Sequence, residues 1–256
     1  MITSKDNARI KRISALGSSA KKRRELGVFL LEGTRLCGEA LREDIEVKEM
    51  FYTSSVAKSD AELIENLKQR AEFCDEVSDT VFAKMSDTCS PQGILLSVAF
   101  KGQIEVPVGG RFLAFEKVQD PSNLGAASRT AEALGFSGLI ISNLSTDPYS
   151  PKSLRASMGA LLRLPLIITN DFKSTLLDCQ NRGFKLNGTV VGGDAIPINR
   201  VNFGENEIAV IGNEATGMTE EIKQICDRLI TIPMTGRAES LNAAVAAGIV
   251  MWEMCR

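Results

Sequence analysis

Short apolar runs alternate with amphipathic segments along the first part of the chain. Runs of this length indicate strands, and apolar positions at helical spacing indicate helices. Strands are predicted over residues 28–31, 48–52, 72–77 and 94–99, and helices over 34–42 and 57–70. The alternation predicts a small α/β unit over residues 27–101. Residues 102–111, which contain Pro107 and the Gly109-Gly110 pair, break the pattern and are predicted to be a linker.

The alternation starts again in residues 112–256. Strands are predicted over 112–115, 139–141, 166–168, 189–191 and 208–211, and helices over 124–134 and 243–254. These strands lack polar alternation, which is typical of a parallel sheet that is covered on both faces. The pattern therefore predicts an α/β fold with two domains.

The composition narrows the class of protein. Hydrophobic residues make up 44% and charged residues 24%, as in soluble globular proteins. No apolar run approaches the roughly 20 residues of a membrane helix, and no secretory signal is visible. The six cysteines are too far apart in the sequence to indicate a metal site, so we expect free thiols, no metal and a cytoplasmic location. The chain has no histidine, which excludes Ser-His-Asp and Cys-His catalysis.

Positive charge is concentrated at the N-terminus. Residues 1–26 contain eight basic and two acidic residues, a net charge of +6 that leaves −8 on the remainder of a chain whose total is −2. A basic helical arm over residues 1–26 indicates a polyanionic partner. The alternative interpretation is an ordinary solvated helix face.

A polar segment follows the first strand of the second half. It runs from Asp120 through Asn123 to Arg129, and Asn123 is predicted to be the N-cap of the following helix. Arg129 lies past the first turn of this helix, and its guanidinium needs an anionic partner, for which a phosphate is well suited. A structural ion pair with Glu132 is the alternative.

Two further loops follow buried strands. In the first, Gly212 and Gly217 enclose Glu214. The second spans 232–242 and contains Pro233 and Gly236; Ser240 or Asn242 can cap the helix that follows it. Loops at the carboxyl ends of strands are where open α/β sheets bind small ligands, although each segment by itself also fits an ordinary turn.

Taken in order, the three segments resemble the SpoU (TrmH-type) branch of the SPOUT RNA methyltransferases. They match that family's motifs N-x-G-x-x-x-R, G-x-E-x-x-G and I-P-M-x-G…S-L-N. Residues 29–33 and 91–94 resemble the ends of a substrate-binding domain similar to the ribosomal L30e/L7Ae fold, and residues 149–160 resemble the two-domain branch of the family. Ala215, Ala243 and Ala244 depart from the usual motif residues by small changes only.

The resemblance implies a fold and a cofactor. Residues 112–256 are expected to form an α/β methyltransferase domain with a deep trefoil knot, and residues 27–101 an L30e-like domain that binds structured RNA. The cofactor is expected to be S-adenosyl-L-methionine, in a bent form, and the protein a homodimer. The residues expected at the cofactor are Gly212, Ile232, Leu241, Met234 and Gly236.

The resemblance also implies a reaction, methylation of a ribose 2′-hydroxyl in RNA. Arg129 is expected to fix the target phosphate and to stabilise the developing oxyanion. Asn123, Glu214, Ser240 and Asn242 are expected to orient the ribose and to hold the motif loops together. The expected substrate is 23S rRNA; the alternatives are tRNA or a non-catalytic RNA-binding factor with the same fold. A nicotinamide enzyme is disfavoured because no G-x-G-x-x-G follows the first strand of either half.

Overall fold

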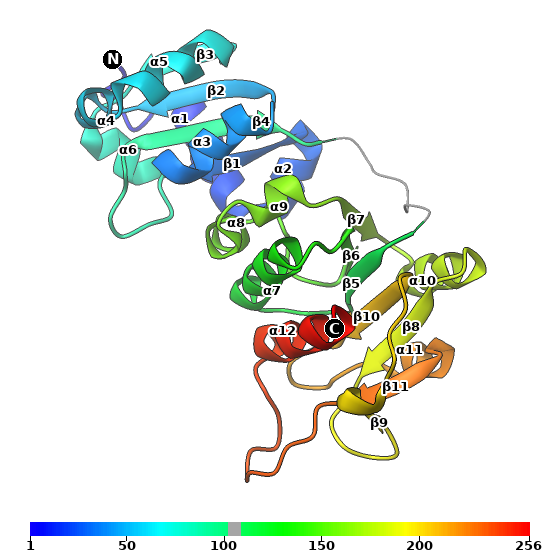
Figure 1. Ribbon diagram of the computed structural model, residues 1–256. Helices are drawn as coiled ribbons and strands as arrows, with labels where there is room; N and C mark the ends of the chain where they lie inside the picture. Colours follow the sequence, from blue (N-terminus) through cyan, green and yellow to red (C-terminus); the bar gives the residue numbers. More distant parts are fainter. Residues whose placement is uncertain (102–108) are drawn as a thin grey trace. The chain divides into compact units, whose positions relative to one another are not determined.

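The computed structural model describes residues 1–101 and 109–256 (Figure 1). The chain divides into two compact units. The N-terminal unit comprises Met1–Gly102 and Tyr149–Leu162, and the C-terminal unit comprises Gln103–Pro148 and Arg163–Arg256. Most of the expected linker, residues 102–108, lies outside the described residues.

The N-terminal unit is built on a mixed sheet of four strands in the order β1-β4-β2-β3. Strand β4 pairs antiparallel with β1 and β2, and β2 pairs parallel with β3. The strands are β1 (Val28–Glu32), β2 (Val47–Tyr52), β3 (Phe73–Glu76) and β4 (Ile94–Ala99). The helices are α1 (Ala8–Ser18), α2 (Ala20–Leu26), α3 (Thr34–Arg42), α4 (Ser54–Ser59), α5 (Ala61–Arg70), α6 (Asp79–Met85) and α8 (Pro151–Ser157).

The first 26 residues differ from the separate basic arm that was expected. Ile10, Ile13 and Leu16 form a buried stripe on α1 and pack with Phe51 and Phe82 in the core of the N-terminal unit. These three residues recur at intervals of three, so they share one helix face. Residues 1–26 are therefore part of the fold of this unit.

Several basic side chains of residues 1–26 form ion pairs or hydrogen bonds within the N-terminal unit. Arg9 and Arg12 both bind the buried carboxylate of Glu49. Arg23 is buried and donates hydrogen bonds to carbonyl oxygens at the end of α1. Within the described part of the chain, Lys22 and Arg24 of this region have no ion-pair partner.

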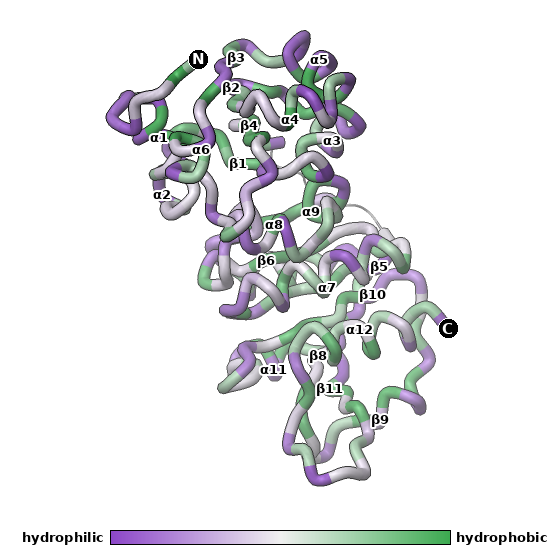
Figure 2. Tube along the Cα trace, turned by 90° about the vertical axis from the view of Figure 1, so that its left-hand side faces the viewer, coloured by the Kyte–Doolittle hydropathy of each residue, from purple (hydrophilic) through white to green (hydrophobic). Residues whose placement is uncertain are grey.

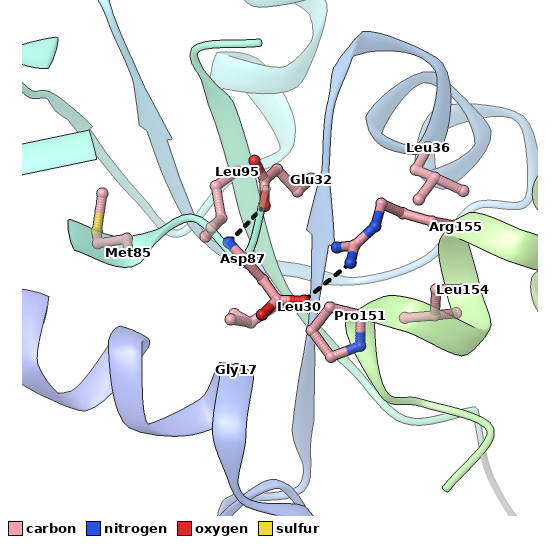
Figure 3. Close-up of a pocket in the computed structure, with 10 residues that line it drawn as sticks. All are labelled: Gly17, Leu30, Glu32, Leu36, Met85, Asp87, Leu95, Pro151, Leu154 and Arg155. Carbon is pink, nitrogen blue, oxygen red and sulfur yellow. Dashed lines mark hydrogen bonds and ion pairs between the residues drawn. The ribbon is translucent and has the colours of Figure 1, made fainter. Parts of the chain in front are cut away.

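A segment from the second half of the sequence completes the N-terminal unit. Leu154 of α8 is fully buried, and Arg155 forms an ion pair of 2.8 Å with Asp87 (Figure 3). The Tyr149 ring packs against Phe29, with a centroid distance of 4.8 Å. The domain boundary therefore differs from the expected one, because residues 149–162 belong with the N-terminal unit.

The C-terminal unit contains a seven-stranded sheet in the order β7-β6-β5-β10-β8-β11-β9. All neighbouring strands are parallel, as the apolar pattern predicts. The strands are β5 (Arg111–Phe115), β6 (Gly138–Ser142), β7 (Leu166–Thr169), β8 (Lys185–Thr189), β9 (Ile196–Pro197), β10 (Glu207–Ile211) and β11 (Arg228–Thr231). The helices are α7 (Pro121–Ala133), α10 (Phe172–Asn181), α11 (Glu220–Ile225) and α12 (Ala243–Met254). The short helix α9 (Ala160–Arg163) belongs to the N-terminal unit except for its last residue.

Helices cover both faces of this sheet. Alternate residues of β5 and β10, such as Phe112 and Val210, join the side chains of α10 and α11 in one core cluster. On the opposite side, α12 packs against α7 and β10 (Figure 1). Figure 2 shows the central strands as hydrophobic segments of the tube. No helix in the described residues is long and apolar enough to cross a membrane.

Candidate functional site

Three loops lie at the carboxyl ends of β5, β10 and β11. They are residues 116–120, 212–218 and 232–242. The second and third loops contain the second and third motifs, and the first loop leads into α7, which carries the first motif. Since β5 and β10 are adjacent and parallel at the centre of the sheet, the first two loops leave the same edge side by side. This edge is where parallel α/β sheets place their ligand sites.

The loop after β10 has a fixed backbone. Asn213 and Gly217 pair across it through two backbone hydrogen bonds of 2.9 and 3.1 Å. The Asn213 Oδ1 atom accepts from the amides of Ala215 and Thr216, and its Nδ2 donates to the Lys117 carbonyl oxygen at 2.9 Å. A β-carbon at Gly212 would overlap the backbone of Gly217, so only glycine fits there. The loop thus offers rigid backbone to a ligand.

A buried carboxylate ties this loop to β5. Glu116, which is 4% exposed, accepts from the Thr219 amide at 3.0 Å and from the Thr219 hydroxyl at 2.6 Å. These bonds satisfy donors at the start of α11. Glu116 is not among the residues predicted from the sequence; the signal for it there is a charged residue directly after an apolar strand.

A chain of side-chain hydrogen bonds joins all three motifs. Glu214 Oε1 accepts from Asn123 Nδ2 at 3.0 Å, and Asn123 Oδ1 accepts from Asn242 Nδ2 at 2.8 Å. Asn242 also caps α12, because its Oδ1 accepts from the amides of Ala244 and Val245. The Glu214–Asn123–Asn242 chain therefore fixes the first helix of the site, the β10 loop and the last helix to one another.

Asn123 is not the N-cap that the sequence predicts. Asp120 caps α7 by accepting from the Ser122 amide at 2.8 Å, and Pro121 occupies the first helical position. Proline is favoured there because the amide it lacks has no partner inside the helix. The helix therefore begins earlier than expected, and the buried Asn123 side chain is available to bind Glu214 and Asn242.

Glu214 is held as a carboxylate. Partial burial raises its pKa, but hydrogen bonds from the Gln119 amide, the Asn123 side chain and the Asp120 amide outweigh this effect, so its pKa lies below the ordinary glutamate value. The amides of Gln119 and Asp120 donate at 3.0 and 3.1 Å. These donors occupy both oxygens of Glu214 and favour its charged form.

Two neighbouring cavities lie at these loops. The first, of about 460 Å³, is lined by Gly212, Ile232, Met234 and Leu241 of the expected cofactor set. The end of β8 and the residues after it, 189–191, form part of its wall. Gly236 lines neither cavity, because it lies on the exposed outer part of the β11–α12 loop.

The second cavity, of about 570 Å³, is lined by four of the five expected catalytic residues, Asn123, Glu214, Ser240 and Asn242. Glu214, Ser240 and Leu241 line both cavities, so the two spaces share a wall. The structure thus brings together residues that are more than a hundred positions apart in the sequence.

Arg129 stands apart from this cluster. It is exposed on α7 and lines neither cavity. Within the described residues it has no hydrogen-bond or ion-pair partner, and Glu132 binds Arg163 at 2.9 Å instead. The alternative interpretation of Arg129 as a partner of Glu132 is therefore wrong, and its guanidinium is free for a partner outside the chain.

The described residues contain no cluster of potential metal ligands. Among residues 1–101 and 109–256, no group of three or more His, Cys, Asp or Glu side chains could hold a metal ion. All six cysteines are free thiols.

Comparison with known families identifies the class of protein that this fold and site define. Residues 110–252 match the SpoU rRNA Methylase family, so the chain belongs to this family. Residues 7–96 match the MRM3-like substrate binding domain. These matches confirm the resemblance inferred from the three motifs.

Individual relatives cover nearly the whole chain. The 23S rRNA (guanosine(2553)-2′-O)-methyltransferase RlmP of Bacillus subtilis is 29% identical over 91% of this chain and 91% of that protein. The 23S rRNA (uridine(2479)-2′-O)-methyltransferase of Streptomyces viridochromogenes is 30% identical over 100% of this chain and 91% of that protein. Among solved structures, the SpoU methyltransferase AviRb of Streptomyces viridochromogenes in complex with AdoMet is 27% identical, with a TM-score of 0.88 over 97% of each chain. These matches confirm the α/β fold.

Proposed function

We propose that this protein is an S-adenosylmethionine-dependent methyltransferase that methylates a ribose 2′-hydroxyl of 23S rRNA. The observation that carries the proposal is the Glu214–Asn123–Asn242 chain, which joins the three family motifs between two adjoining cavities. Two relatives that match along almost the whole chain are 23S rRNA 2′-O-methyltransferases by name, and AviRb binds AdoMet. They support both the reaction and the rRNA substrate.

The 460 Å³ cavity fits the cofactor. Its volume lies within the range of roughly 300–1,000 Å³ that is typical of small-molecule sites. Its wall combines exposed backbone at Gly212 with the apolar residues Ile232, Met234 and Leu241. We assign the cofactor contacts to these four residues, because backbone donors and acceptors recognise a nucleoside without ordering a side chain.

The neighbouring cavity is assigned to the target ribose. When bound, S-adenosylmethionine supplies an electrophilic methyl group on a good leaving group. The task of the chain is to place the 2′-oxygen in line and close, since holding reacting atoms about 3–3.5 Å apart lowers the barrier substantially. Asn123 and Asn242 are fixed by their mutual hydrogen bond, and Ser240 presents its exposed side chain between the two cavities.

Arg129 is assigned to the RNA. A guanidinium keeps its proton in proteins, so it acts as a donor and not as the base that receives the hydroxyl proton. Its planar fork suits a phosphate, and its positive charge stabilises negative charge on the attacking oxygen. The absence of any partner within the described chain supports this assignment.

Within one chain, Arg129 lies apart from the other four predicted catalytic residues. In a homodimer, Arg129 of the second copy can reach them. Helix α12 packs against α7, which carries Arg129, and α12 leaves Val245 and Trp252 51% and 59% exposed. We assign the dimer interface to α12, with Arg129 of one copy reaching the site of the other. Light scattering measures this oligomeric state directly.

The trefoil knot is also part of the proposal. Strand β11 lies beyond β8 in the sheet, yet the chain returns from it to α12, which packs against β10 and α7. Such a return along the sheet edge supports a knotted path through the β10 and β11 loops. The six free thiols support a cytoplasmic location for the enzyme.

Calorimetry and methyl transfer test the central assignment together. The expected result is one S-adenosylmethionine site per chain and transfer of labelled methyl groups to 23S rRNA. A folded protein that shows no binding at millimolar cofactor would overturn the enzymatic function. Binding without transfer would favour a non-catalytic RNA-binding factor, and transfer to tRNA alone would replace the substrate.

A further inference from the structure

Two buried side-chain polar atoms have no hydrogen-bond partner in the part of the chain that the structure describes. They are Arg155 Nη1 and Thr189 Oγ1. Arg155 lies in the N-terminal unit, where its other terminal nitrogen binds Asp87. Thr189 lies in the wall of the cavity assigned to the cofactor. Because native structures satisfy nearly all buried polar atoms, a lone hydroxyl at this place needs a physical explanation.

The neighbouring strand offers no hydrogen-bond partner to the Thr189 hydroxyl in the described structure. It is the last residue of β8 and is registered with Ile230 of the neighbouring strand β11. Thr231, the next residue of β11, also lines the cavity, but its hydroxyl accepts a hydrogen bond from the Gly192 amide at 3.3 Å. The fold thus provides a partner for the hydroxyl of Thr231 and none for that of Thr189.

Stability alone would favour valine at this position. Valine has nearly the shape of threonine and suits a buried strand, whereas a buried hydroxyl without a partner costs free energy. The hydroxyl therefore lowers the stability of the unliganded fold. A ligand that pairs with it would recover the cost only in the bound state.

We propose that the Thr189 hydroxyl is a hydrogen-bonding group for the nucleoside half of the cofactor. This inference rests on the cofactor assignment made above. The hydroxyl is attached to the β-carbon, so a rotation of about 120° about χ1 moves it to another staggered position without moving the strand. Because Thr189 lines the cavity, such a rotation can bring the hydroxyl to a bound ligand there.

The other polar side chains of the cavity favour the nucleoside half as the partner. Lys223 and Glu239 carry charge into the cavity wall and suit the charged amino-acid half of S-adenosylmethionine. Thr189 is neutral and can both donate and accept, which suits a ribose hydroxyl or a ring nitrogen. Thr189 then adds a side-chain contact to the backbone contacts expected at Gly212, Ile232 and Leu241.

Thr189→Val separates this role from a structural one, because it changes stability and affinity in opposite directions. Without cofactor, the melting temperature should stay equal or rise by up to about 4 °C, since the variant removes an unsatisfied hydroxyl. The affinity for S-adenosylmethionine should fall about 3- to 10-fold, as expected for one lost hydrogen bond. Thr189→Ser keeps the hydroxyl and should bind within about twofold of the parent.

A matched control and a second ligand sharpen the test. The Thr175 hydroxyl lies outside the cavity and binds the Asp171 carbonyl oxygen at 2.9 Å, so Thr175→Val should lower the melting temperature and leave cofactor affinity unchanged. Methylthioadenosine, which has the nucleoside half without the amino acid, should lose the same factor as S-adenosylmethionine in Thr189→Val.

The measurements are calorimetry with both ligands and thermal denaturation of the unliganded full-length proteins. Unchanged affinity of Thr189→Val for S-adenosylmethionine would overturn the inference. A lower melting temperature together with weaker binding that Thr189→Ser does not restore would also overturn it, since that is the signature of a structural role. A loss confined to S-adenosylmethionine would overturn the nucleoside assignment. A parent protein that binds neither ligand would instead overturn the proposed function.

Discussion

Asn123 is the only side chain that contacts both Glu214 and Asn242 in the described hydrogen-bond chain, so its replacement should disconnect Asn242 and the start of α12 from Glu214. Asn123→Ala removes one hydrogen bond to a carboxylate and one between amides. Such bonds contribute about 1.5–3 and 0.5–1.5 kcal/mol respectively. Glu214 is exposed, so water offsets part of the loss, and about 2 kcal/mol is a reasonable total.

If the full 2 kcal/mol appears in the transition state, methyl transfer should slow about 30-fold. The melting temperature should fall by several degrees, since about 1 kcal/mol corresponds to about 2–4 °C in a domain of this size. Cofactor affinity should change less, because Asn123 does not line the cofactor cavity. Single-turnover methylation, calorimetry and thermal denaturation measure these three quantities. Parent-like turnover would show that the two hydrogen bonds of Asn123 do not contribute to methyl transfer.

Asn123→Asp tests the direction of the same hydrogen bonds. The introduced carboxylate can still accept from Asn242, but it places a second negative charge beside Glu214 and removes the donor. Paired carboxylates raise each other's pKa, so one proton shared between them restores a donor as the pH falls. Activity relative to the parent should therefore rise from about pH 8 to about pH 5.5. A ratio that is flat with pH would contradict this account.

The lowered pKa of Glu214 gives the matching prediction for the parent. The contribution of Glu214 to stability is fully present above the ordinary glutamate pKa. It is lost only as the pH falls through the lower pKa of the folded state. Over the range used for the Asn123→Asp comparison, the parent should therefore show no change from this group.

Three further predictions concern separate parts of the molecule. Arg129→Ala should reduce methyl transfer by at least about 100-fold. Cofactor affinity should stay within a few-fold of the parent, since Arg129 lines neither cavity and has no partner in the described chain. Parent-like methyl transfer would show that the role of Arg129 is misassigned. Gly212→Ala should abolish cofactor binding, because the added β-carbon would overlap the backbone of the loop. Gly204→Ala is the control: its added β-carbon makes only an ordinary contact, so this variant should bind the cofactor normally. Equal cofactor binding by both variants would contradict a rigid loop. Replacing Lys22 and Arg24 by Gln should weaken RNA binding and should reduce the slope of log K against log salt concentration by about 1.5–2. An unchanged slope would show that these two cations do not contact phosphate.

The sequence predicts much of the sheet and its ligand-binding edge. Strand β4, helix α3 and helix α12 have the expected bounds. Strand β4 and helix α12 are apolar segments, and the apolar residues of the amphipathic helix α3 recur at helical spacing. Strand β8 begins four residues before the expected start. Asn187 and Gly188 interrupt its apolar pattern, but both are buried, and Asn187 is hydrogen-bonded to Glu207 at 2.6 Å. A polar residue inside a strand can be recognised only once its partner is known.

The features that the sequence does not predict depend on contacts between residues far apart in the chain. The basic composition of residues 1–26 concealed the buried stripe of Ile10, Ile13 and Leu16. The membership of residues 149–162 in the N-terminal unit depends on packing against strands more than fifty residues earlier. Likewise, no local pattern pairs Asn123 with Asn242, since 119 positions separate them. The motifs identify these residues, whereas their connection through Glu214 comes from the fold.

Mapping of 2′-O-methyl groups on 23S rRNA is the direct test of ribose methylation by this protein. Ribosomal RNA from cells that lack the protein is compared with RNA from cells that express the parent or the Asn123→Ala variant. We expect one ribose methylation in 23S rRNA that is absent without the protein, present with the parent and strongly reduced with the variant. A parent-dependent methyl group on a base, or 23S rRNA methylation identical in all three samples, would contradict this expectation.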